Sequence, residues 1–77
     1  MPLVRISVPT HLAAEKVHVL ADAVHEALVA TCGVPSNERF QLVSRFATGD
    51  MFLDPTFPDV ERSADASIVE ITPERAN

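Results

Sequence analysis

The chain has little of several residue types, and each scarcity excludes a class of structure or function. Its 77 residues include one cysteine, Cys32, so the chain has no internal disulfide and no cysteine pair for a zinc site. Its two glycines leave no glycine-rich loop for a phosphate group. The six basic residues stand against eleven acidic ones, and they form no basic run or stripe of the kind that binds nucleic acid.

Long apolar runs are absent as well. No stretch is long enough to span a bilayer, and the amino-terminus lacks a charged segment followed by an apolar one, so we expect no secretory signal. The unpaired Cys32, which we expect to be a small buried residue near a helix end, fits a reducing compartment. The sequence therefore predicts a cytoplasmic protein that binds neither a membrane nor nucleic acid.

What the chain does have is a large share of hydrophobic residues, 47%. This composition is not that of a disordered tail, and the length allows one domain, 1–77. The core of a chain this short rarely contributes more than about 3–5 kcal/mol to the free energy of unfolding, unless disulfides, metals or association add to it. We therefore expect a homo-oligomer.

The hydrophobic pattern changes period along the chain. Residues 3–8 and 39–46 alternate with a period of two, which is typical of strands. Between them, residues 11–32 carry apolar side chains at helical spacing, with Thr10 as the expected N-cap and Gly33 as the helix end. A strand, a helix and a strand form a β-α-β unit, whose two strands are parallel.

The rest of the chain predicts one more element. Residues 47–65 contain two prolines, a glycine and several aspartates, which indicate an irregular loop around a short apolar piece at 51–53. Residues 66–71 predict a last short strand, which Pro73 ends. The predicted fold class is therefore α/β (α+β): a β-α-β unit with parallel strands and a short extra strand, completed by oligomerisation.

Pro2 is the first candidate for chemistry. Removal of Met1 would expose its secondary amine at the head of a strand. A free α-amino group has a reference pKa of about 7.7–8, which suits general acid–base work near neutral pH. The alternative is structural, because proline is common at position 2 and tolerated as the first residue of a strand.

Two further candidates follow from the parallel strands, whose amino-terminal ends share one edge of the sheet. Pro2 then lies near Glu38 and Arg39, which brings an amine, a carboxylate and a guanidinium together. These groups would transfer a proton, position water and hold an anionic substrate, respectively. The alternative is that Glu38 and Arg39 are ordinary turn and edge residues.

Three histidines, His11, His18 and His25, are spaced by seven residues. On a helix this spacing puts neighbours about 10 Å apart, too far for one metal ion to bind two of them. We therefore predict no metal site. His25 alone is kept as a remote residue that would support the site.

Three stretches of the chain form a distinctive combination: Met1-Pro2-Leu3-Val4-Arg5-Ile6, Asp22-Ala23-Val24-His25 and Gly33-Val34-Pro35-Ser36-Asn37-Glu38-Arg39-Phe40-Gln41. Together they resemble the tautomerase superfamily, and its malonate semialdehyde decarboxylase-like branch in particular. Glu61-Arg62-Ser63 continues the likeness, which covers nearly the whole chain. The resemblance implies a β-α-β building block and an amino-terminal proline that acts without a cofactor as general base or acid on small oxo acids.

The resemblance also implies roles for other residues. An acidic residue, usually Asp, stands in the family where this chain has Glu38. Arginines after the last strand bind the substrate carboxylate, and Arg75 is the candidate here, in a shifted register. Longer members carry a second β-α-β unit beyond this point, so the chain resembles their amino-terminal half, whereas short members assemble as hexamers of single units.

Together these observations predict a tautomerase, or a related decarboxylase or hydratase, that acts on a small carboxylate-bearing oxo acid. Pro2 and Glu38 are its candidate catalytic residues, Arg39 and Arg75 bind the substrate, and a trimer or hexamer is the expected assembly. The alternative is a catalytically silent assembly subunit, or a fragment of a longer tautomerase-like protein.

Overall fold

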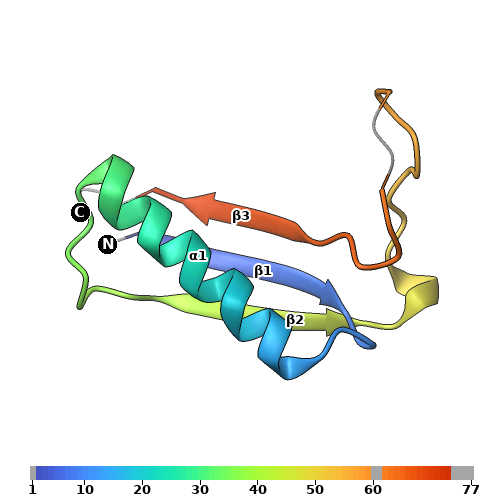
Figure 1. Cartoon of the computed structure of the whole chain (residues 1–77), viewed down its shortest axis with the longest axis horizontal. Helices are drawn as coiled ribbons and strands as arrows, with labels where there is room; N and C mark the ends of the chain where they lie inside the picture. Colours follow the sequence, from blue (N-terminus) through green and yellow to red (C-terminus); the bar gives the residue numbers. More distant parts are fainter. Residues whose placement is uncertain (1, 60–61, 74–77) are drawn as a thin grey trace.

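One helix lies against one face of a three-stranded sheet (Figure 1). The computed structural model describes residues 2–59 and 62–73. In chain order the elements are β1 Leu3–Pro9, α1 Ala14–Cys32, β2 Gln41–Phe46, the short 3₁₀ helix η1 Thr48–Asp50 and β3 Ile68–Thr72. Strand β1 is central; β2 pairs with it in parallel and β3 antiparallel. The predicted β-α-β unit with an extra strand is confirmed.

The core lies between β1 and α1. Alternate residues of β1 point to the helix, so Val4, Ile6 and Val8 are buried, with 0–2% of their surface exposed. The helix contributes buried residues at helical spacing, Val17 and Ala21 among them. Because branched and aliphatic side chains fill this layer, burial of β1 under α1 is the main contribution of the core to stability.

The helix begins later than the sequence predicted. Thr10 is not its N-cap: the N–H of Leu12 donates to the carbonyl of Pro9 over 3.1 Å, which closes a turn after β1, and α1 starts at Ala14. The chain needs this turn to reverse its direction from β1 into the helix. His11 therefore lies in the turn and not on the helix.

The helix ends where the sequence predicted. Gly33 adopts the left-handed conformation with φ 68°, and its N–H donates to the carbonyl of Leu28. Cys32 is exposed, which corrects the prediction that it is buried. The last turn of α1 extends beyond the beginnings of the strands, so the sheet does not cover this residue (Figure 1).

Both flanking strands differ from their predicted bounds by about two residues. Strand β2 starts at Gln41 instead of 39. Strand β3 is shifted to 68–72 because the N–H of Ala66 donates to the carbonyl of Ser63 over 3.2 Å and holds that residue in a turn. These shifts leave the parallel pairing of β1 and β2 unchanged.

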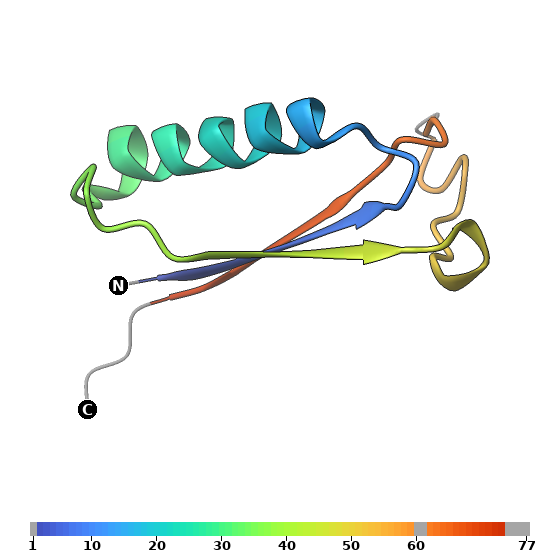
Figure 2. The same cartoon turned by 90° about the horizontal axis from the view of Figure 1, so that it is seen from below.

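The second face of the sheet carries no helix (Figure 2). Register places Leu3, Leu42 and Phe46 on this open face, together with Ile68. Leu42 is 51% exposed and Ile68 42%, whereas Leu3 is half-buried. The predicted exposure of Val43 is confirmed: it is 42% exposed, although it lies on the helix side of the edge strand β2.

The described residues, 2–59 and 62–73, include no helix with the length and apolar character needed to cross a membrane.

Candidate functional site

Two of the predicted site residues, Pro2 and Arg39, lie at one edge of the sheet. Val4 pairs with Gln41, and the N–H of Val4 donates to the carbonyl of Phe40 over 3.0 Å. Continued by two residues, this parallel register puts Pro2 level with Arg39. Pro2 is half-buried and directly precedes β1. The expected convergence of the starts of β1 and β2 is therefore present.

The segment between α1 and β2 delivers Glu38 and Arg39 to this edge. It leaves the helix through Gly33, and the N–H of Val34 donates to Leu28 over 3.4 Å. A second turn closes where the N–H of Glu38 donates to the carbonyl of Pro35 over 3.0 Å. Glu38 is half-buried at the end of this turn.

Arg39 is held on the helix side of the sheet. Its Nη2 forms an ion pair with Oδ1 of Asp22 over 2.8 Å, and its Nε donates to Oε1 of Gln41 over 2.9 Å. Gln41 in turn donates from Nε2 to the backbone carbonyl of Ala21 over 2.9 Å. These contacts use two of the five N–H donors of the guanidinium group.

The last strand ends at the same edge. Thr72 pairs with Leu3 because β3 runs antiparallel to β1. The predicted substrate-binding residue Arg75 lies outside the described residues. The antiparallel direction of β3, which the sequence did not reveal, brings the carboxyl end of this strand beside Pro2.

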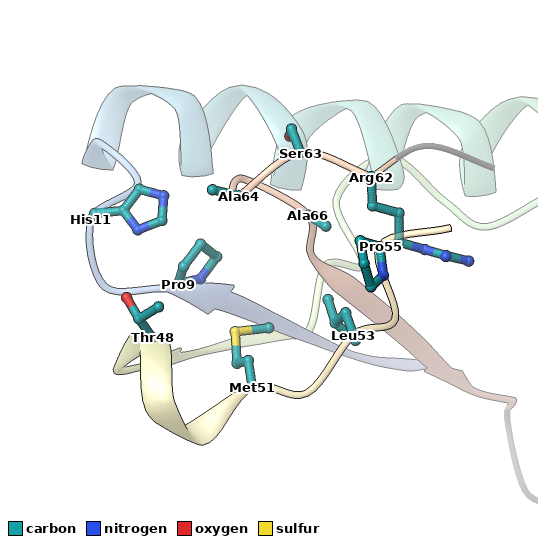
Figure 3. A pocket seen from close by; sticks show the side chains of 10 residues that line it. All are labelled: Pro9, His11, Thr48, Met51, Leu53, Pro55, Arg62, Ser63, Ala64 and Ala66. Carbon is teal, nitrogen blue, oxygen red and sulfur yellow. The ribbon is translucent and has the colours of Figure 1, made fainter. Parts of the chain in front are cut away.

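The sequence did not predict a cavity at the opposite end of the sheet. A cavity of about 300 Å³ lies beyond the carboxyl end of β1, roughly seven residues or about 23 Å from Pro2. Mostly apolar side chains line it, among them Pro9, Met51 and Leu53 (Figure 3). No pattern in the sequence predicts such a cavity, because its walls form only when residues of the segments 48–55 and 62–66 pack against the end of β1 and the turn that follows it.

Side-chain bonds hold the walls of this cavity. Nε2 of His11 donates to Oδ1 of Asp65 over 2.8 Å, which joins the turn after β1 to the segment before β3. Arg62 donates from Nη1 to the backbone carbonyls of Asp54 and Phe57. The cavity is therefore a second structural feature, distant from the predicted proton-transfer residues.

A carboxyl group in this loop, that of Asp54, has a lowered pKa. Backbone N–H groups of Thr56 and Phe57 donate to Oδ2 of Asp54 over 3.1 and 2.7 Å, and they hold the pKa of this carboxyl below its ordinary value of 3.8. Among the described residues, no group of three or more His, Cys, Asp or Glu side chains is arranged to hold a metal ion.

Comparison with known proteins connects this architecture to one group of enzymes. No family model matches the chain. The probable tautomerase YusQ of Bacillus subtilis (strain 168) is 24% identical over 72 residues, which are 94% of this chain and 57% of that protein. The structure of FG41 malonate semialdehyde decarboxylase inhibited by 3-bromopropiolate superimposes with a TM-score of 0.79, at 30% identity over 87% of this chain and 51% of the other.

A second set of solved structures gives the same result. It comprises malonate semialdehyde decarboxylase as wild type, as a mutant with alanine for the proline at its first position, and in an inactivated form. The TM-score is 0.79 at 31% identity, over 87% of this chain and 52% of that protein. The resemblance to the tautomerase superfamily is confirmed. The chain spans about half the length of the tautomerase-superfamily proteins that it matches.

Proposed function

We propose that this chain, once Met1 is removed, is a cofactor-independent tautomerase, or a related decarboxylase or hydratase, that acts on a small carboxylate-bearing oxo acid. One observation carries the proposal: Pro2 directly precedes β1, at the edge where the segment with Glu38 and Arg39 arrives, on a scaffold like that of malonate semialdehyde decarboxylase. The exposed thiol of Cys32 is compatible with a reducing cytoplasm as its compartment.

The secondary amine of Pro2 would transfer the proton. In its neutral form it accepts a proton from the enol hydroxyl of the substrate, and the protonated amine then returns a proton to the neighbouring carbon. A reference pKa of about 7.7–8 for a terminal amine allows both forms near neutral pH.

Glu38 and Arg39 have supporting roles in this proposal. The carboxylate of Glu38 would position water or polarise the substrate, from a half-buried position at the end of its turn. Arg39, oriented by Asp22 and Gln41, would use its remaining donors to bind the substrate carboxylate, and Arg75 would contribute a second guanidinium.

Assembly is the second part of the proposal. The open face of the sheet exposes apolar side chains, and an exposed apolar patch on a small chain is typical of an interface. A homo-oligomer, a trimer or a hexamer, would cover this face. It would also bring residues of a neighbouring subunit toward the edge that carries Pro2.

A second candidate function has its own observation. The chain spans about half of each relative that it matches, and Arg39 is engaged by Asp22 within the same unit. A catalytically silent assembly subunit, or a fragment of a longer tautomerase-like protein, would have these properties too. Such a protein would keep the scaffold and transfer no proton.

The deciding experiment compares three forms of the protein: one that begins at Pro2, one that retains Met1, and Pro2→Ala. Intact mass assigns the first residue, and turnover is measured on the enol form of phenylpyruvate and on malonate semialdehyde. We expect full activity only in the form with a free Pro2, and a loss of about 10²–10⁴-fold in the other two. Unchanged activity in Pro2→Ala, or in protein that retains Met1, would refute the role of Pro2. Inactivity of all three correctly folded forms would favour the silent subunit.

A further inference from the structure

One face of α1 holds the segment that carries Glu38 and Arg39. Asp22 and His25 are three residues apart on the helix, so their side chains lie on the same face. Asp22 pairs with Arg39 over 2.8 Å, and Nε2 of His25 lies 2.9 Å from the carbonyl oxygen of Ser36. The stretches 22–25 and 33–41, which both resemble the tautomerase superfamily, are thus joined by one ion pair between side chains and one bond from a side chain to the backbone.

The hydrogen-bond partner of His25, the backbone carbonyl of Ser36, determines which ring nitrogen carries hydrogen. A backbone carbonyl only accepts hydrogen bonds, so His25 donates from Nε2. In a neutral imidazole this bond selects the tautomer with hydrogen on Nε2 and leaves Nδ1 as an acceptor. His25 is half-buried, whereas His18, on the same helix, is exposed.

The bond reaches the middle of the connecting segment. Turns at its two ends are closed by backbone bonds, from Val34 to Leu28 and from Glu38 to Pro35. Ser36 lies inside the second of these turns, two residues before Glu38. A bond from the rigid helix at this point restrains the position at which Glu38 and Arg39 enter the sheet edge.

We propose that His25 is a positioning residue for this segment: its Nε2–H holds Ser36, and through it sets the placement of Glu38 and Arg39 relative to Pro2. The assignment rests on the proposed function, because it gives His25 the task of supporting that site. A displacement of a catalytic group by about 1 Å costs up to 10²-fold in rate, so one such restraint matters to turnover.

Two variants separate the hydrogen bond from the space that the ring fills. His25→Gln keeps an N–H donor at a similar reach, and His25→Leu keeps the apolar bulk without a donor. His18→Leu serves as the control, because it makes the same change at an exposed position of the same helix. Far-UV circular dichroism and melting curves confirm that each variant is folded.

The first readout is amide hydrogen exchange of residues 36–39, which does not depend on activity. We expect His25→Leu to exchange about two- to tenfold faster there, the factor that corresponds to the loss of one net hydrogen bond. His25→Gln and His18→Leu should remain close to the wild type. Unchanged exchange in His25→Leu, or failure of His25→Gln to restore protection, would overturn the proposal.

The second readout uses the unmodified protein. Nitrogen-15 chemical shifts of the His25 ring should report hydrogen on Nε2 in the neutral form. A neutral ring with hydrogen on Nδ1 would contradict the bond to Ser36. This measurement keeps the proposal testable even where His25→Leu fails to fold.

The third readout is turnover, measured on a substrate that the protein with a free Pro2 converts. We expect kcat/KM to fall in His25→Leu and to recover in His25→Gln. If the protein with a free Pro2 converts no substrate, the proposed function fails, while hydrogen exchange and the ring tautomer still decide whether His25 holds the segment.

Discussion

The backbone N–H of Val4 donates to the carbonyl oxygen of Phe40 over 3.0 Å, and this bond aligns the beginnings of β1 and β2. Because the strands are parallel, the residues that precede them lie at one edge of the sheet. Strand β3 ends at the same edge, where Thr72 pairs with Leu3. Three segments that are distant in the sequence therefore meet next to Pro2.

Arg39→Ala should raise KM for an acidic substrate by about tenfold, because a charge-assisted hydrogen bond to the carboxylate is lost. Arg45→Ala is the matched control: Arg45 is likewise held by a hydrogen bond, from Nη1 to the backbone carbonyl of Leu12, but it lies about 20 Å further along β2. Steady-state kinetics of both variants, with melting temperatures measured in parallel, make the comparison. Equal changes in KM would mean that Arg39 is only a structural charge.

The two glycines should respond to alanine in opposite ways. Gly33 has φ 68°, and an added Cβ would meet no atom within 4 Å. Gly33→Ala should therefore lower the free energy of unfolding by about 1–2 kcal/mol, which is the strain of a left-handed backbone at a residue with a Cβ. Gly49 has equal space and no positive φ, so Gly49→Ala should be neutral or stabilise by up to about 1 kcal/mol through the unfolded chain. Chemical denaturation of the two variants measures both. A stable Gly33→Ala protein would show that the end of α1 is not held in this conformation.

The open face of the sheet should be an interface in solution. Leu42 and Ile68 are 51% and 42% exposed on this face, so Leu42→Lys combined with Ile68→Lys should dissociate the oligomer. Val19→Lys changes a residue that is 65% exposed on the helix and should leave the assembly intact. Light scattering or sedimentation at micromolar concentration gives the mass of each. A wild-type monomer that unfolds cooperatively would contradict the proposed assembly.

Acid should loosen the turn at Asp54. Its pKa in the folded chain lies below 3.8 because Thr56 and Phe57 donate to the carboxylate, so these bonds stabilise the turn above that pH and are lost as the pH falls below 3.8 through the folded pKa. Amide chemical shifts of Thr56 and Phe57, followed from about pH 5 to about pH 2, should show the transition. Asp54→Ala should abolish it. A transition centred above 3.8 would show that the two bonds do not favour the charged form.

Local patterns in the sequence determined the elements of this protein. The period of two in residues 3–8, the helical spacing before Gly33 and the return to alternation in residues 39–46 predict a β-α-β unit. The helix between the two strands returns the chain to the same end of the sheet and so makes them parallel, and parallel strands imply that Pro2 and Arg39 share an edge. These predictions succeeded because side-chain periodicity and the geometry of a glycine at φ 68° depend on a few neighbouring residues.

Only the tertiary structure decided the contacts between those elements. Helix α1 starts at Ala14 because the chain must turn after β1, and β3 pairs antiparallel with β1 because the segment after β2 folds back across the sheet. Cys32 is exposed because the last turn of α1 extends past the strands. The bond from His25 to Ser36 and the cavity beside His11 depend on how separate elements pack, and no local pattern in the chain encodes that packing.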